Sequence, residues 1–307
     1  MPAKPLKLGT RRSPLAMAQA HEARDRLCRA HGWTEDAIEI VPVLASGDKV
    51  QDRPLADIGG KALWTKELDG WLHDGSIDFA VHSMKDVETI RPEWLTIAAL
   101  LPRADVRDVL VGARSIAAIP PGARIGTSAP RRAAQMLNIR PDLTIVGFRG
   151  NVATRLAKLQ AGEADVTLLA AAGLERLGQT GVGTALDAPE WLPAPAQGAI
   201  GIECRTDDAM TRRALSAIDH APTRAQVAAE RALLLALGGN CHSPIAVWTQ
   251  GSDEVTMTVR LYSPDGLVRT GGEATFPADS NGPAELAARL LSDAPEAVAV
   301  HFSGPPA

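Results

Sequence analysis

Short apolar segments alternate with helical patterns through the first two thirds of this 307-residue chain. Leu6–Thr10 has the pattern of a strand, and a helical pattern follows over Pro14–Ala30. Strands that alternate with helices predict α/β layers on parallel or mixed sheets. Further strands are predicted over Ile38–Leu44, Asp78–Met84, Arg124–Thr127, Thr144–Phe148, Asp165–Ala171 and Ala199–Cys204, and further helices over Ala62–His73, Arg131–Asn138 and Val152–Ala161.

The last third has a different pattern. Thr223–Leu237 is predicted to be a helix, with Thr223 and Gln226 as a T-x-x-Q capping signal and Gly238 as its stop. Three strands, an SPDG turn, a helix and a closing strand should follow, which predicts a small α+β domain. These elements are Ile245–Gln250, Val255–Tyr262, Leu267–Phe276, the helix Pro283–Ser292 and the strand Ala297–Phe302.

Two segments of the chain resemble each other. LGTRRSPLAMAQ (Leu8–Gln19) and IGTSAPRRAAQ (Ile125–Gln135) both contain a strand end with Gly-Thr, then Ser, Pro, an arginine pair and a helix with Gln. Two related α/β lobes with a cleft between them would produce such a repeat. Chance similarity is the alternative, because turns reuse Gly, Ser and Pro.

Charge and cysteine usage exclude several classes of protein. The formal net charge of −4 gives no global basic field for nucleic acid, so anion binding must come from local arginines. MPAKPLKLGT lacks the apolar region of a signal peptide, and no apolar run is long enough to span a membrane. Cys28, Cys204 and Cys241 are odd in number and far apart, which implies no disulfide framework. We therefore expect a cytoplasmic protein.

Three predicted strand-to-helix turns carry arginines. In GTRRSP, Ser13 is a plausible N-cap and Pro14 the first helical residue. Cations in a first helical turn oppose the helix dipole, so their repetition suggests another role. Together with backbone N–H groups, such arginines can bind carboxylates or phosphates, although each alone could be a solvated surface residue. They are Arg11 and Arg12, Arg131 and Arg132 in GTSAPRR, and Arg149 and Arg155 around the predicted cap Asn151 in FRGNVATR.

Two further residues could carry chemistry. Asp86 follows a predicted strand in AVHSMKD, where it could act as an acid, a base or a counter-ion, or form a turn paired with Lys85. Cys241 follows Gly238, Gly239 and Asn240, so it should lie on a loop. A metal site does not suit its spacing. A hydrolase nucleophile paired with a histidine and a free loop cysteine both remain open.

The ordered set of motifs resembles the porphobilinogen deaminase family, also called hydroxymethylbilane synthases. The resemblance is strong over roughly residues 6–250 and rests only on pattern beyond them. The segments that carry it, in family order, are GTRRSPLAMAQ, GGKALWTKEL, AVHSMKD, GTSAPRR, FRGNVATRL, AAAGLERLG, AQGAIGIECR and GGNCHSPIA.

This resemblance implies an α/β fold with two periplasmic-binding-protein-like lobes plus a small C-terminal α+β domain. The lobes would span residues 1–99 with 200–218 and residues 104–194, and the third domain residues 222–307. The chain should cross between the lobes near 100–104 and 194–199. The implied protein is a monomeric transferase of tetrapyrrole and heme biosynthesis, with porphobilinogen as its substrate and no metal, nucleic-acid or membrane partner.

The resemblance also implies roles for individual residues. Cys241 would carry a dipyrromethane cofactor through a thioether bond, and Asp86 would be catalytic by stabilising cationic pyrroles and managing their protons. Each pyrrole has an acetate and a propionate group, which the arginines would bind. The implied cofactor-binding residues are Ser13, Ser83, Lys85, Thr127, Ser128, Arg131 and Arg132, and the implied substrate-binding residues are Arg11, Arg149, Arg155, Arg176 and Gln197.

Four positions depart from the common family pattern. Trp64 stands where Phe is common, Ala129 where Ser is common, and Ala196 and Asn240 where Gly is common. None of these departures removes a charged or covalent group. A non-enzymatic, two-lobed protein that binds small anions is the rival hypothesis, but it gives no role to Cys241 or Asp86. A cysteine-dependent hydrolase is a weaker one.

Overall fold

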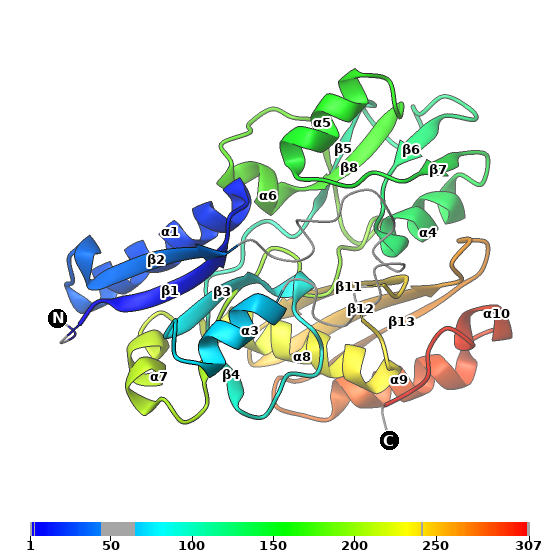
Figure 1. Cartoon of the computed structure of the whole chain (residues 1–307). Helices are drawn as coiled ribbons and strands as arrows, with labels where there is room; N and C mark the ends of the chain where they lie inside the picture. Colours follow the sequence, from blue (N-terminus) through cyan, green and yellow to red (C-terminus); the bar gives the residue numbers. More distant parts are fainter. Residues whose placement is uncertain (1, 3, 44–64, 241, 306–307) are drawn as a thin grey trace. The chain divides into compact units, whose positions relative to one another are not determined.

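The computed structural model describes residues 2, 4–43, 65–240 and 242–305 (Figure 1). Contacts between residues divide the chain into two compact units. The first unit contains residues 1–104 and 198–224, and the second contains residues 105–197 and 225–307. The chain therefore passes from the first unit to the second after Ala104 and returns after Gln197.

The first unit is built on a five-stranded mixed sheet. Its strand order is β2-β1-β3-β10-β4, and the first three strands are parallel while β10 runs antiparallel to both neighbours. Leu8, Leu27, Phe79 and Ile202 form part of its buried core. The strands are β1 (Leu6–Arg11), β2 (Ile38–Val43), β3 (Phe79–Ser83), β4 (Leu95–Leu100) and β10 (Ile200–Arg205), and the helices α1 (Pro14–His31), α3 (Lys66–His73) and α7 (Ala209–Ser216).

The second unit contains a five-stranded sheet of the same topology. Its order is β7-β6-β8-β5-β9, again with three parallel strands followed by a strand antiparallel to both neighbours. Leu110, Ile125, Met136 and Leu168 belong to its core. The strands are β5 (Asp108–Val111), β6 (Arg124–Gly126), β7 (Thr144–Val146), β8 (Val166–Ala170) and β9 (Thr184–Leu186), and the helices α4 (Pro130–Ile139), α5 (Val152–Gln160) and α6 (Ala171–Arg176).

The two sheets place the repeated segments at equivalent positions. Leu8–Gln19 lies on β1 and α1, and Ile125–Gln135 lies on β6 and α4. β1 and β6 are each the second strand in the spatial order of their sheet, and each repeat joins that strand to the next helix. The structural correspondence favours related lobes over chance similarity.

The C-terminal part of the second unit is a separate layer of sheet and helices. An antiparallel sheet of order β11-β12-β13 packs against α8 and α9, with Leu233, Met257, Phe276 and Leu286 in the shared core. The predicted fold class, two α/β lobes and a small α+β domain, is confirmed. These elements are α8 (Ala221–Leu237), β11 (Ile245–Gly251), β12 (Glu254–Tyr262), β13 (Arg269–Pro277), α9 (Gly282–Asp293) and α10 (Glu296–Ala299).

The strand predicted over Ala297–Phe302 is wrong, because the chain there forms α10 and a following turn. A strand would place Val298, Val300 and Phe302 on one face. Instead Val298 and Phe302, four residues apart, join the core, while Val300 is 67% exposed. Apolar residues at every second position suggested a strand, but the buried residues are four apart, as in a helix.

The predicted cap of α8 is also wrong. The helix begins at Ala221, so Thr223 lies inside its first turn. His220 Nδ1 accepts the Thr223 N–H at 3.3 Å, and Thr223 Oγ1 accepts the backbone N–H of Arg103 at 3.0 Å. Gln226 donates to Gly251 O at 3.0 Å instead of completing a capping box. An imidazole therefore takes the position predicted for the hydroxyl. None of the described helices is long and apolar enough to cross a membrane.

Candidate active site

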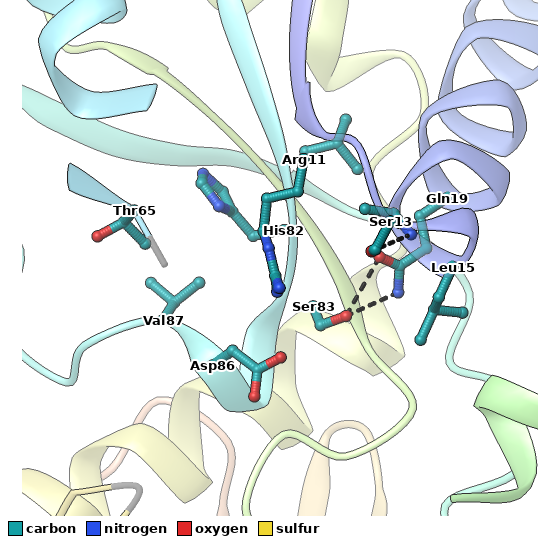
Figure 2. Close-up of a pocket in the computed structure, with 11 residues that line it drawn as sticks. Arg11, Ser13, Leu15, Gln19, Thr65, His82, Ser83, Asp86 and Val87 are labelled. Atoms are coloured by element: carbon teal, nitrogen blue, oxygen red, sulfur yellow. Dashed lines mark hydrogen bonds between the residues drawn. The ribbon is translucent and has the colours of Figure 1, made fainter. Parts of the chain in front are cut away.

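A pocket in the first unit lies where β1 and β3 end (Figure 2). These neighbouring strands are parallel, so their carboxyl ends meet at one edge of the sheet, the usual place for ligands in α/β folds. Arg11 is the last residue of β1 and Ser83 the last residue of β3. Ser13 and Asp86 also line the pocket. The fold therefore brings together four residues that the sequence predicted for the site.

Local hydrogen bonds hold the two serines. Ser13 caps α1 as predicted, because its Oγ accepts the Ala16 N–H at 3.3 Å and Pro14 begins the helix. Ser83 Oγ accepts a hydrogen bond from Gln19 Nε2 at 2.8 Å. Gln19 is buried on α1, although sequence analysis assigned it no role. Both hydroxyls are thereby placed by the same helix.

Asp86 is positioned by a short 3-10 turn, Met84–Asp86. Met84 is buried, and its backbone N–H donates to Ala199 O at 3.0 Å. A side chain at Gly201 would overlap the Met84 sulfur, so it would force the buried Met84 side chain to move. Figure 2 shows the Arg11 side chain extending toward the partly buried Asp86. The turn thus presents a carboxylate opposite a guanidinium.

A buried ionic network lies beside this pocket. Arg91 donates to both oxygens of Glu203, at 2.9 and 2.7 Å, and also pairs with Asp69 and Glu88. His82 lines the pocket, and its Nε2 lies 3.3 Å from Glu203 Oε2. Burial raises the pKa of Glu203, but His82 and Arg91 outweigh burial and lower this pKa to about 2. The network therefore keeps a fully buried carboxylate ionised.

This network predicts that the protein loses stability in acid. The folded pKa of Glu203 is lowered from 4.5 to about 2, so its contribution is present above pH 4.5 and is lost as the pH falls toward 2. We expect a loss of about 3 kcal/mol in the free energy of unfolding over this window. Urea unfolding followed by circular dichroism at pH 7, 5, 4, 3 and 2.5 would measure it.

Glu203→Gln should be less stable than wild type at pH 7, because Arg91 loses a counter-ion, and should lose less stability between pH 5 and 2.5. Glu273→Gln is the matched control, since Glu273 is an exposed carboxylate that accepts only one described hydrogen bond, from Thr258 at 2.7 Å. If the free energy of unfolding fell equally with pH in wild type and in Glu203→Gln, the prediction would be contradicted.

The second unit carries the other predicted arginines at one edge of its sheet. β6, β7 and β8 are parallel, and their carboxyl ends lead to the segments that bear these arginines. Asn151 caps α5 as predicted, by accepting the Thr154 N–H at 2.9 Å. Arg155 Nε donates to Gly150 O at 3.0 Å. The half-buried arginines at this edge are Arg149, Arg155 and Arg176.

The start of α4 brings in Thr127 and Ser128. Thr127 is buried, and its Oγ1 accepts the Ala129 N–H at 3.1 Å, while Ser128 is exposed. Ala129 is the N-cap and makes no side-chain cap, which is the consequence of its departure from serine. Thr127 thus supplies a local hydrogen bond beside a residue that cannot cap the helix.

Arg131 and Arg132 are buried and face an aspartate that sequence analysis missed. Asp108, the first residue of β5, is fully buried and lies 2.7 Å from Arg131 Nη2 and 2.6 Å from Arg132 Nη2. Gln197 Nε2 donates to Asp108 Oδ1 at 2.9 Å and to Val106 O at 2.7 Å. The available signal was a charged residue opening an apolar strand, Asp-Val-Leu-Val.

Ala196, the family departure next to Gln197, adopts a left-handed backbone with φ of 58°. Residues with a Cβ rarely adopt this region, which explains why glycine suits the position. The buried Glu230 carboxylate accepts two hydrogen bonds, one from the Ala196 N–H and one from the Thr249 hydroxyl group. Glu230 therefore helps to hold the segment that leads into Gln197.

The predicted site residues that the structure describes are divided between the two units of the chain. The first unit holds Arg11, Ser13, Ser83, Lys85 and Asp86, and the second holds Thr127, Ser128, Arg131, Arg132, Arg149, Arg155, Arg176 and Gln197. Cys241 and Trp64 lie outside the described residues. Beside Cys241, Asn240 Oδ1 accepts the His242 N–H at 2.8 Å. Among the residues that the structure describes, no group of His, Cys, Asp or Glu side chains could hold a metal ion.

Comparisons with known proteins identify a family over most of the chain. Residues 6–213 match the model described as "Porphobilinogen deaminase, dipyromethane cofactor binding domain", and residues 225–294 match "Porphobilinogen deaminase, C-terminal domain". A porphobilinogen deaminase of Sphingopyxis alaskensis is 55% identical over 304 residues, covering 97% of this chain and 96% of the relative. One of Paracoccus denitrificans is 48% identical over 301 residues, covering 96% of each. Among solved structures, the methionine binding protein MetQ matches 74% of this chain and 94% of its own, with 12% identity and a TM-score of 0.42.

Proposed function

The chain belongs to the porphobilinogen deaminase family, and from this premise we propose that it joins four porphobilinogen molecules head-to-tail, with loss of ammonia, to give hydroxymethylbilane. The proposed enzyme is a transferase that is primed by a dipyrromethane bound covalently to Cys241. The observation that carries this proposal is the pocket of the first unit, where Asp86 lies among Arg11, Ser13 and Ser83.

The donor set of this pocket fits a dipyrromethane. Such a group has carboxylates that need cationic or hydroxyl donors, and pyrrole N–H groups that need an acceptor. Arg11, Ser13 and Ser83 supply the donors, and Asp86 supplies a carboxylate acceptor. When bound, the dipyrromethane supplies the free pyrrole carbon to which the first substrate is joined.

Asp86 has the charge that the reaction needs. Loss of ammonia from porphobilinogen leaves positive charge on a pyrrole, and the later formation of a C–C bond requires a proton to leave. A fixed carboxylate stabilises the positive charge and can accept the one proton that leaves. Anchoring of the Met84–Asp86 turn by buried Met84 keeps Asp86 in place without an entropic cost at the moment of reaction.

The basic and polar residues of the two units are proposed to bind different parts of the pyrrole chain. Ser13, Ser83, Lys85, Thr127, Ser128, Arg131 and Arg132 are proposed to bind the cofactor, and Arg11, Arg149, Arg155, Arg176 and Gln197 the substrate or growing chain. The division follows the family resemblance, and what supports a binding role is that all of these residues except Gln197 lie at or after the carboxyl ends of parallel strands in the two sheets. Guanidinium groups bind carboxylates with two parallel hydrogen bonds, which suits the acetate and propionate of each pyrrole.

We also propose a cytoplasmic monomer with domains at 1–99 with 200–218, 104–194 and 222–307. The three sheets support the domain bounds, while the location and the monomeric state are taken from the sequence and the family resemblance. Two elements extend one residue past these bounds, because β4 ends at Leu100 and α8 begins at Ala221.

Intact mass spectrometry of the purified protein, combined with a turnover assay, tests the function. The expected mass exceeds the sequence mass by one dipyrrole, and the protein should give the Ehrlich colour of a dipyrrole and consume porphobilinogen with release of ammonia. The rival hypothesis, a non-enzymatic protein that binds small anions, predicts the bare sequence mass and unchanged porphobilinogen. A protein that turned over porphobilinogen without any covalent adduct would contradict the proposed priming.

A further inference from the structure

Asp108 is the centre of a buried polar cluster in the second unit. Its side chain has no exposed surface, and four side chains donate to it. Arg131 Nη2 donates to Oδ2 at 2.7 Å, and Arg132 donates to Oδ1 through Nη2 at 2.6 Å and to Oδ2 through Nε at 3.2 Å. Trp191 Nε1 donates to Oδ2 at 2.8 Å, and Gln197 Nε2 to Oδ1 at 2.9 Å.

These contacts use up the hydrogen-bonding capacity of the Asp108 carboxylate. Two carboxylate oxygens have about four lone-pair sites, and five donor atoms already point at them. Burial raises the pKa of Asp108, but Arg131 and Arg132 outweigh burial and hold this pKa well below its usual range. Asp108 therefore stays ionised and is unsuited to proton transfer.

The same contacts fix the two guanidinium groups. Arg131 Nη1 donates to Leu192 O at 2.8 Å, and Arg132 Nη1 donates to Leu168 O at 2.8 Å. Each guanidinium is thus bound to Asp108 on one side and to a backbone carbonyl on another. Both side chains follow Pro130 in the first turn of α4, beside a helix terminus that itself favours anions.

The charges in this cluster do not balance. Among the residues that the structure describes, the two guanidinium groups form ion pairs with one shared carboxylate, so one positive charge remains beside the N-terminus of α4. A buried charge without a partner is costly, and an anionic ligand can provide that partner. An arginine already held in place also loses less side-chain entropy when the ligand arrives.

We propose that Asp108 is a positioning residue, which holds Arg131 and Arg132 as a preorganised pair with one net positive charge for a pyrrole carboxylate. This inference rests on the proposed function. It gives Asp108 no contact with the ligand, and it assigns the amide nitrogen of Gln197 to the support of the pair.

Three variants test the positioning role. Asp108→Asn removes the charge and keeps the shape. Asp108→Glu keeps the charge and moves it by one methylene. Asp108→Asn combined with Arg132→Gln, compared with Arg132→Gln alone, shows whether Asp108 still matters once one of the two guanidinium groups is absent. Asp165→Asn is the matched control, because Asp165 pairs with Arg124 at 2.9 Å on the surface of the same unit.

The readouts are the fraction of each protein that carries the covalent dipyrrole, by intact mass, and the KM for porphobilinogen of that fraction. Folding is checked by circular dichroism and cooperative thermal unfolding. In folded Asp108→Asn we expect adduct occupancy to fall, or KM to rise, by about 10- to 100-fold, as for loss of a charge-assisted contact, and a smaller further loss when Asp108→Asn is added to Arg132→Gln. Asp108→Glu should recover part of the loss, and Asp165→Asn should match wild type.

The outcomes separate this inference from the proposed function. A wild-type protein without adduct would overturn the function and the inference together. Wild type with adduct, alongside folded Asp108 variants of unchanged occupancy and KM, would overturn the inference alone. If none of the three Asp108 variants folded, Asp108 would serve stability only, and the positioning role would again be overturned.

Discussion

Asp86→Asn is expected to lower kcat for porphobilinogen by about 10²- to 10⁴-fold, the range typical for loss of a catalytic acid, base or fixed charge. Asparagine keeps the shape of the side chain but cannot stabilise a cationic pyrrole or accept its proton. Asp86→Glu keeps the charge and shifts it by one methylene, so it should retain more activity than Asp86→Asn. Steady-state kinetics on protein with confirmed adduct would measure both.

The control concerns assembly of the cofactor. Neither substitution touches the Cys241 thiol, so apoprotein of both variants should still attach supplied hydroxymethylbilane, with loss of water, as a four-pyrrole thioether adduct that intact mass detects. The 3-10 turn depends on buried Met84 and its bond to Ala199 O, which neither substitution touches. Near wild-type turnover by adduct-bearing Asp86→Asn would show that Asp86 is a turn residue and that the proposed chemistry is wrong.

Cys241→Ser is expected to abolish both the covalent adduct and turnover, with a loss on the order of 10³-fold or more. The proposed nucleophile for assembly is the Cys241 thiolate, and a serine hydroxyl does not ionise at neutral pH. Intact mass and peptide mapping would place the adduct of the wild type on Cys241 and show its absence from the variant.

The other two cysteines provide matched controls. Cys28 and Cys204 are buried, and burial raises the pKa of both thiols, that of Cys204 to about 11. A buried thiol that resists ionisation is a poor nucleophile. Cys28→Ser and Cys204→Ser should therefore keep the adduct. An active Cys241→Ser variant, or an adduct mapped to another cysteine, would refute the assignment.

Elements with strong local signals could be predicted from the sequence. β1 with α1, and β6 with α4, combine an apolar strand, a Pro at the first helical position and a clear helical period. The error at Ala297–Phe302 arose where a short apolar alternation fits both periods. β5 was missed because it has four residues and opens with a charged one.

The candidate site was predictable only in part, because local motifs reveal its residues but not their distant partners. The motif residues stand in recognisable local segments, but their partners do not. Gln19 meets Ser83 across 64 residues, and Asp108 meets Trp191 across 83. No local pattern encodes such pairs, because the sheet order alone brings them together. The fixed carboxylates Asp108 and Glu203 were therefore found only in the structure.

The strand order of the first unit has a consequence for synthesis of the chain. β10 lies between β3 and β4, yet it follows Leu100, the end of β4, by about 100 residues. At about 5–20 residues per second, a ribosome would need roughly 5–20 s to supply it. During that interval β3 and β4 lack the strand that lies between them, and all five strands of the second sheet are synthesised before β10. The nascent N-terminal lobe must wait with open strand edges, and such edges are where chaperones bind and misassembly begins.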